Sequence, residues 1–341
     1  MSLDLIMLGN VPVQQLILRA QLAESKGFDG VWIADERFYR EVYSLLAVIA
    51  TETSKVRLGP CVTDPYARHP ALTAMAIATL DEISDGRAVL GIGAGISGFE
   101  EMGVERPKPA KAMREAIELI RMLLTGDSVD YHGEIIQLTN GALNFKPPRA
   151  NVPVYVASNS PMGQRMAGGV ADGAIAEACA SVEEVKAFRA VLAEGAAKRN
   201  RDLSQVKIVA RLNTCISKDG KAARDAVRPS VARALGAGRM KFLTAQENGL
   251  TLPAEAVAPF ASVPYHSGTA PFAPLLPLIT DRHVDAFTLA GTVDDAVAHV
   301  DALLKAGVDS VIILPFAPPG GTVEDTIVSM GTHVWPQVRK S

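Results

Sequence analysis

The chain has 341 residues, of which 48% are hydrophobic, and its 34 lysines and arginines nearly balance its 37 aspartates and glutamates. This length suits one large domain over residues 1–341, and the balanced charge argues against nucleic acid or an anionic membrane, so a small-molecule substrate is the expected partner. Three isolated cysteines, Cys61, Cys179 and Cys215, fit neither a disulfide framework nor a thiolate zinc site and indicate a reducing cytoplasm.

The first residues, MSLDLIMLGNVPVQQ, contain no basic leader. No later run approaches the roughly 20 apolar residues that cross a bilayer. We therefore expect neither a targeting segment nor a membrane anchor.

Short apolar runs rich in valine and isoleucine alternate with longer segments of helical period, which is typical of repeated β–α units around a parallel sheet. In the first half, the patterns predict strands at 3–9, 30–35, 56–62 and 88–93, and helices at 13–27, 42–53, 70–85 and 111–124. In the second half, they predict strands at 152–157, 174–178, 206–217 and 311–315, and helices at 162–170, 182–198, from about 221, and at 293–306. Eight such units predict an α/β fold of the (β/α)8 TIM-barrel type.

Two segments do not fit this repeat. Residues 130–143 predict an inserted hairpin, because HGE in their middle is typical of a turn. Residues 236–292 are rich in proline and alanine and too long for an ordinary loop, so they predict a lid-like insertion. The alternative fold, a doubly wound sheet, needs a glycine fingerprint at its first turn, and GNVPVQQ at 9–15 lacks one.

Ligands of a (β/α)8 barrel are held by the loops that follow the strands, and two such loops attract attention. GIGAG at 91–95 would let a flat ring or a phosphate approach the backbone, although an ordinary turn also explains it. ASNSPMG at 157–163 opens a predicted helix, whose N-terminus attracts phosphate. An ordinary serine or asparagine N-cap is the alternative for that segment.

Two acidic residues end predicted buried strands. Asp35 is a candidate acid or a hydrogen-bond acceptor for a polar ring edge, and pairing with Arg37 or Arg68 is the alternative. Glu177 interrupts the apolar run AIAEACA, so desolvation would raise its pKa and make it a candidate proton donor. An outward salt bridge is the alternative for Glu177.

Other catalytic classes find no support in the motifs. The six histidines show no HxH or HExxH spacing, so no metal site is expected, and His69, before a proline at a helix start, is interpreted as a cap. No GxSxG elbow is present, which argues against a serine hydrolase.

Three segments together resemble the luciferase-like superfamily of flavin- and deazaflavin-dependent oxidoreductases, in particular the deazaflavin enzymes typified by methylenetetrahydromethanopterin reductase. They are FDGVWIADERFYREVYSLLAVIA from residue 28, VRLGPCVTDPYARHPALTAMAIATLDEISDGRAVLGIGAG from residue 56, and VPVYVASNSPMGQRMAGGVADGAI from residue 152. The resemblance implies hydride transfer between coenzyme F420 (8-hydroxy-5-deazaflavin) and a small organic substrate in a homodimeric enzyme. An FMN-dependent monooxygenase acting with molecular oxygen is the alternative, and a non-catalytic relative is a further one.

The resemblance also implies roles for individual residues. A cis peptide bond is expected between Cys61 and Val62, where the resulting bulge would support one face of the coenzyme ring. The predicted catalytic residues are Asp35 and Glu177, and the predicted cofactor-binding residues are Asp35, Cys61, Val62, Thr63, Gly93, Ala94, Gly95, Ala157, Ser158, Asn159 and Ser160.

The chain departs from the methylenetetrahydromethanopterin reductases at two positions. Those enzymes carry a glutamate within strand one and an aspartate after the glycines of strand four, where this chain has Met7 and Ile96. We therefore expect a related reductase or dehydrogenase with another substrate. Four side chains of the predicted insertion favour a sizeable apolar or aromatic substrate, unless they form the insertion's own core; they are Phe260, Tyr265, Phe272 and Leu276.

Overall fold

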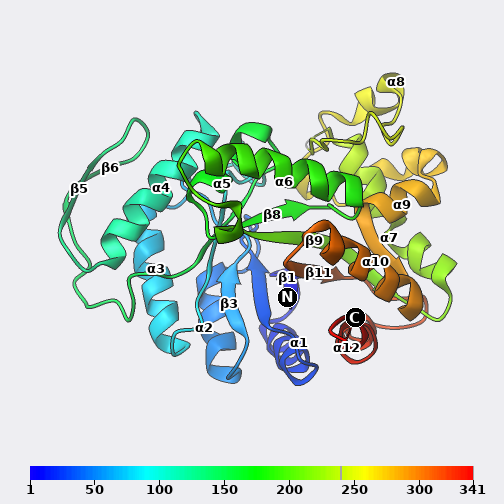
Figure 1. Ribbon diagram of the computed structural model, residues 1–341, viewed down its shortest axis with the longest axis horizontal. Helices are drawn as coiled ribbons and strands as arrows, with labels where there is room; N and C mark the ends of the chain where they lie inside the picture. Colours follow the sequence, from blue (N-terminus) through cyan, green and yellow to red (C-terminus); the bar gives the residue numbers. More distant parts are fainter. Residues whose placement is uncertain (239, 341) are drawn as a thin grey trace.

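The computed structural model describes residues 1–238 and 240–340, and its centre is a parallel barrel (Figure 1). The barrel strands pair in the order β3, β2, β1, β11, β9, β8, β7, β4. Isolated parallel bridges at Leu58–Ala88 and Thr63–Ile92 join the two ends of this order, which confirms the predicted barrel. The strands are β1 (Ser2–Leu8), β2 (Gly30–Ala34), β3 (Arg57–Pro60), β4 (Leu90–Gly93), β7 (Val154–Ala157), β8 (Gly173–Glu177), β9 (Lys207–Ile216) and β11 (Ser310–Pro315).

Helices connect the strands and surround the barrel. They are α1 (Val13–Ser25), α2 (Val42–Glu52), α3 (Pro70–Ile83), α4 (Pro109–Leu124), α5 (Pro161–Val170), α6 (Val182–Ala197), α7 (Gly220–Gly236) and α10 (Val293–Ala306), followed at the end of the chain by α11 (Val323–Ser329), a π-helical turn (Met330–Val334) and α12 (Trp335–Val338). Local sequence explains several boundaries. His69 accepts a hydrogen bond from the backbone N–H of Ala71 and so caps α3, as predicted. Thr292 and Asp295 form a capping box at the start of α10.

The strands are apolar on both faces because one face meets the helices and the other fills the barrel. On β1, Leu3, Leu5 and Met7 belong to the outer cluster, whereas Ile6 belongs to the inner one. The inner cluster of buried side chains comprises Ile6, Trp32, Ala34, Val89, Tyr155, Ile175, Val209 and Ile312. These side chains form the floor on which any ligand at the strand ends must rest.

The contact between β3 and β4 depends on two glycines. A Cβ atom at Gly59 would overlap the carbonyl oxygen of Val89, and one at Gly91 would overlap the carbonyl oxygen of Pro60. Only a residue without a side chain therefore allows the two backbones to approach so closely.

The antiparallel pair β5 (Val129–His132) and β6 (Gln137–Gly141) confirms the predicted hairpin, although β5 begins one residue before the predicted range, and the pair projects from one end of the molecule (Figure 1). The buried carboxylate of Glu115 on α4 anchors its turn. It accepts hydrogen bonds from the backbone N–H groups of Glu134, Ile135 and Ile136, at 2.8–3.0 Å. The hairpin is thus attached to the barrel by a charged side chain that satisfies three turn donors.

Residues 236–292 were predicted as a lid-like insertion, but their C-terminal part is regular structure. Residues 281–291 form α9 (Asp281–Phe287) and β10 (Thr288–Gly291), and β10 pairs in parallel with β9. The irregular part, called the insertion below, runs from 237 to 279 between α7 and α9. It contains α8 (Ala254–Val257) and the 3-10 segments Ala258–Phe260, Tyr265–Ser267 and Ala270–Leu278.

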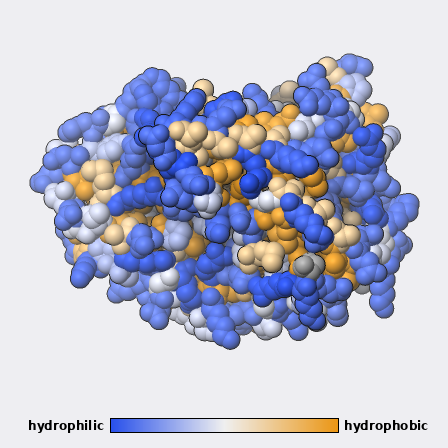
Figure 2. All heavy atoms as spheres, in the orientation of Figure 1, coloured by the Kyte–Doolittle hydropathy of each residue, from blue (hydrophilic) through white to orange (hydrophobic). Residues whose placement is uncertain are grey.

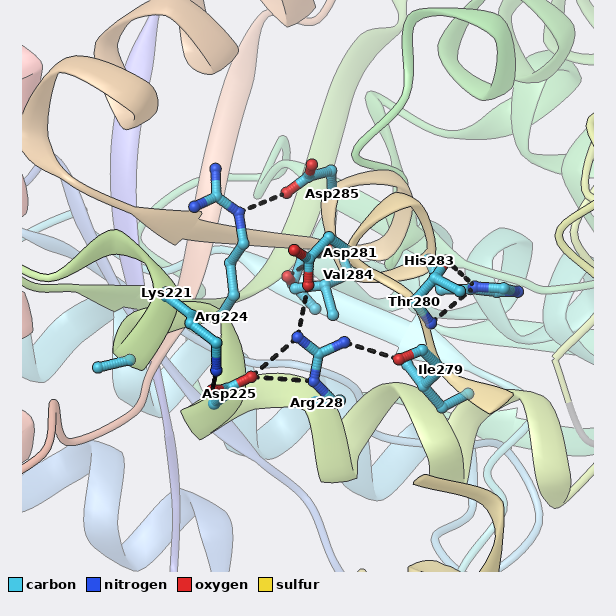
Figure 3. A network of polar contacts seen from close by, with 12 residues as sticks. Lys221, Arg224, Asp225, Arg228, Ile279, Thr280, Asp281, His283, Val284 and Asp285 are labelled. Carbon is cyan, nitrogen blue, oxygen red and sulfur yellow. Dashed lines mark hydrogen bonds and ion pairs between the residues drawn. The ribbon is translucent and has the colours of Figure 1, made fainter. Parts of the chain in front are cut away.

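Polar contacts between α7 and α9 hold the two ends of the insertion close together (Figure 3). Arg228 on α7 donates to the carbonyl oxygen of Ile279 at 2.7 Å and pairs with Asp281 at 2.5 Å. Arg224 on the same helix pairs with Asp285 at 3.1 Å. The two ends of the insertion are therefore fixed to each other through α7 and α9.

Hydrophilic side chains dominate the rim of the face shown in Figure 2, and apolar ones show in patches nearer its centre. Among the described residues, we find no helix with the length and apolar character needed to span a membrane.

We expect Gly91→Ala to destabilise the protein by about 2–3 kcal/mol, because the added methyl group overpacks the contact between β3 and β4. Urea denaturation followed by circular dichroism measures this change. Gly220→Ala at the start of α7 is the matched control: the atoms nearest to its Cβ would be side-chain atoms of Asp295, Arg224 and Thr292, which can move, so the change should stay within about 1 kcal/mol. Equal stability of the two variants would contradict the close contact.

Candidate functional site

A cavity of about 350 Å³ opens at the C-terminal ends of the barrel strands. Its volume is within the range usual for small-molecule sites. All of the predicted site residues line it, except Thr63. The other lining residues are Ile6, Leu8, Glu36, Ile96, Ser97, Pro109, Met113, Ile175, Arg211, Lys241 and Tyr265, together with Ala34.

Thr63 was predicted to bind the cofactor, but it does not line the cavity. Its side chain is fully buried, and its backbone N–H donates to Gly91 while its carbonyl oxygen accepts from Gly93. Thr63 thus pairs with β4 and its side chain lies in the protein interior, whereas Val62 lines the cavity.

The peptide bond between Cys61 and Val62 is cis, as the resemblance implied. Both residues line the cavity. Burial raises the pKa of the Cys61 thiol from 9.0 to about 12, and Arg211 opposes this effect only partly. The thiol therefore stays protonated at neutral pH and presents a weakly polar, unreactive wall.

Asp35 is held in place by a partly buried arginine. Arg37 donates to its Oδ1 atom at 2.9 Å, and the same guanidinium also pairs with the fully buried Asp64. Asp64 in turn accepts hydrogen bonds from the backbone N–H groups of Tyr66 and Ala67. The pairing of Asp35 with Arg37, one of the two alternatives considered from the sequence, is thus present, and Asp35 still lines the cavity.

The environment of Glu177 differs from the buried one predicted from the sequence. It is not desolvated: its side chain is 38% exposed, and Arg211 donates to its Oε1 atom at 2.9 Å. The salt bridge was expected to point outward, but both side chains line the cavity. Arg211 lies opposite Glu177 in the register of β8 and β9, and it also donates to Asn213 at 3.2 Å.

The start of α5 provides donors at one end of the cavity. Ser160 is its N-cap and accepts from the backbone N–H of Gly163 at 3.1 Å, so the alternative of an N-cap is also correct. Ser158, Asn159 and Ser160 nevertheless line the cavity, and Lys241 of the insertion lines it as well. A helix N-terminus, hydroxyl groups and an ammonium group together suit an anion such as a phosphate.

The insertion contributes a second residue, Tyr265, to the cavity wall. Its hydroxyl donates to Oε1 of Glu36 at 3.0 Å. Burial and the carboxylates of Glu36 and Glu177 raise the pKa of Tyr265 above its usual range, so the phenol remains a donor. Phe272 behaves differently, since it is buried in the cluster that joins the insertion to α7.

Arg211 and Lys241 were not predicted as site residues, whereas Tyr265 was one of the four insertion side chains expected to favour an apolar or aromatic substrate, and it lines the cavity. The sequence offered one signal, an arginine in the middle of the apolar run VARLNTC, because a charged side chain inside a barrel strand needs a polar space to face. Within 1–238 and 240–340, no group of three or more histidine, cysteine or acidic side chains is arranged to hold a metal ion.

A family model described as luciferase-like monooxygenase matches residues 6–310. The 5,10-methylenetetrahydromethanopterin reductase of Archaeoglobus fulgidus is 36% identical over 321 residues, which cover 94% of this chain and 94% of that protein. The enzyme of the same name from Methanolobus tindarius is 34% identical, covering 95% of this chain and 96% of that one.

The solved structure of a coenzyme F420-dependent tetrahydromethanopterin reductase from Methanopyrus kandleri is similar over almost its full length. Its TM-score is 0.87 at 28% identity, and the match covers 99% of both chains.

Because only the thiolate is nucleophilic, we expect Cys61 to react with iodoacetamide at pH 8 at least about 100-fold more slowly than a free thiol of ordinary pKa. Its rate should continue to rise with pH up to its pKa of about 12, whereas an ordinary thiol reaches its plateau earlier. Mass spectrometry of the Cys61 peptide measures the rate, with Cys61→Ser identifying the signal. Alkylation at the free-thiol rate at pH 8 would contradict the raised pKa.

Proposed function

We propose that this chain, which belongs to the luciferase-like monooxygenase family, is an oxidoreductase that transfers hydride between coenzyme F420 and a small organic substrate. The observation that carries the proposal is the cavity at the strand ends, which combines an apolar wall at Val62 and Gly93 with an anion-suited helix N-terminus. The similar reductase of known structure is named as F420-dependent, which supports the choice of coenzyme.

The residues present fit such a coenzyme. An elongated ligand with a flat ring and an anionic tail needs an apolar surface at one end and donors at the other. Val62 and the glycine-rich end of β4, Gly93 to Gly95, would lie against the ring, with Cys61 beside them. Ala157 to Ser160 would surround the phosphate, and Lys241 would add a positive charge there.

When bound, the deazaflavin supplies a ring carbon that gives or accepts a hydride. The protein positions the reactants and controls protons and water. Asp35 and Glu177 are the carboxylates proposed to exchange a proton with the substrate, and Arg37 and Arg211 fix their positions. Tyr265 and the insertion would exclude water from the reacting atoms.

The wall at β1 supports a substrate other than that of the similar reductases. Met7, the position compared with their strand-one glutamate, belongs to the outer cluster, and the residues of β1 that line the cavity are Ile6 and Leu8. Ile96 after β4 also lines it. These apolar side chains favour an apolar or aromatic substrate that needs no carboxylate at those places.

A homodimer in the cytoplasm completes the proposal. Apolar side chains lie exposed on the outer surfaces of α2 and α3, at Val48, Leu72, Met75 and Ile83, and association would cover them. The three free cysteines agree with a reducing compartment.

Titration of the purified protein with F420 and with FMN tests the choice of coenzyme. We expect F420 to bind, with a change in its absorbance and fluorescence, at concentrations where FMN does not. Tight binding of FMN alone would instead favour a monooxygenase. Binding of neither would contradict the proposed function.

Ser158→Ala should weaken F420 binding about fivefold, which corresponds to the loss of about one hydrogen bond to the phosphate. Fluorescence titration measures the dissociation constant. Ser262→Ala, at an exposed serine of the insertion, is the matched control and should leave the constant unchanged. If the two variants bound F420 equally, the phosphate would have to lie elsewhere.

A further inference from the structure

The insertion is fixed at its base on one side of the cavity and also reaches the opposite side. Its ends are joined through Arg228, and Phe272 and Leu275 pack it against α7. Near its start, the buried carboxylate of Glu184 on α6 accepts from the backbone N–H groups of Leu243 and Thr244, at 2.8 and 2.9 Å. All of these anchors lie on the side of α6 and α7.

The segment around Tyr265 reaches across to the loops after β2 and β4. The phenol donates to Glu36, which follows β2, at 3.0 Å. The next residue, His266, lies 3.3 Å from the carboxylate of Glu101, which follows β4, and both of those side chains are exposed. Of these two contacts, only the one between Tyr265 and Glu36 lies in the cavity wall.

Arg233 on α7 restrains both the ring and the backbone of Tyr265. The guanidinium of Arg233 on α7 lies 4.6 Å from the centre of its ring and donates to its carbonyl oxygen at 2.8 Å. A cation over an aromatic ring and a hydrogen bond to the same residue restrict both ring and backbone. The hydroxyl is thus presented to Glu36 by a side chain with little freedom of its own.

Glu36 has a different environment from its neighbour. The carboxylate of Asp35 is positioned by Arg37 within the barrel, whereas the partner of Glu36 comes from the insertion, 229 residues away in the sequence. A glutamate side chain without such a partner samples several rotamers in a wall open to water.

From this arrangement we propose that Tyr265 is a positioning residue: it fixes the carboxylate of Glu36 in the cavity wall, so that the wall is complete only while the insertion covers the mouth. The part of this proposal that concerns bound coenzyme rests on the proposed function. The contact itself belongs to the protein without coenzyme and can be tested there.

Hydrogen–deuterium exchange of the coenzyme-free protein tests the contact. In Tyr265→Phe and in Glu36→Ala, the amides of residues 258–270 should exchange about tenfold faster than in the wild type, while those of β1 stay protected. The double variant should exchange no faster than either single one, because both changes remove the same interaction. Tyr39→Phe, at an exposed tyrosine after β2, is the matched control and should exchange as the wild type does.

Glu36→Gln keeps an acceptor for the phenol and should keep most of the protection, which preserves the test if Glu36→Ala folds poorly. Wild-type exchange in Tyr265→Phe, or additive effects in the double variant, would overturn the proposal.

A further measurement separates positioning from a merely structural role. Iodide should quench the fluorescence of bound F420 more strongly in Tyr265→Phe than in the wild type, with the dissociation constant of F420 unchanged. Tyr39→Phe should be quenched as the wild type is. Unchanged quenching in Tyr265→Phe would contradict positioning. A wild type that binds no F420 would refute the proposed function instead, and the exchange experiment would still decide the role of Tyr265.

Discussion

The close approach of β3 to β4 determines where the loops after these two strands lie at the C-terminal end of the barrel. Gly59 and Gly91 remove the side chains that would otherwise separate these strands, and the two bridges that join them lie on either side of that contact. Beyond it, the chain after β3 carries the cis bond at Cys61–Val62, and β4 ends in Gly93. Cys61, Val62 and the glycine-rich end of β4 therefore line one cavity, because the strands beneath them are in contact.

The charges around the cavity share a common arrangement. Asp35 pairs with Arg37, Glu177 pairs with Arg211, and Glu36 accepts from Tyr265. Each carboxylate therefore has a defined partner, which limits the cost of placing acidic groups beside an apolar surface. The partners come from different places in the sequence: Arg37 is local, Arg211 lies on a neighbouring strand, and Tyr265 belongs to the insertion.

That difference explains what could be predicted from the sequence. The C-terminal ends of parallel strands meet at one edge, so locating the strands was enough to place Asp35, Val62 and Gly93 around one cavity. Thr63 does not line the cavity because it pairs with Ile92 of β4, a contact between strands that no local pattern in the sequence indicates. The exposure of Glu177 depends on how far the mouth opens, which no local pattern expresses.

Physical reasons also explain why other cavity residues were not predicted from the sequence. Arg211 lies within β9, a strand of ten residues, and its direction depends on the stagger of the strands. The position of Lys241 depends on the path of a long irregular segment that has neither helical nor strand periodicity. For the same reason, the sequence indicated Tyr265 as a side chain of the insertion but not its contact with Glu36.

The junction at Arg228 has a consequence for how such a protein can diversify. Because the two ends of the insertion meet on α7 and α9, lengthening or shortening the segment between them changes the entropy of a closed loop, which varies only slowly with length. The two attachment points on α7 and α9 stay the same whatever residues the segment between them contains. New substrate specificities can thus arise through replacement of the insertion, while the barrel strands that form the rest of the cavity stay unchanged.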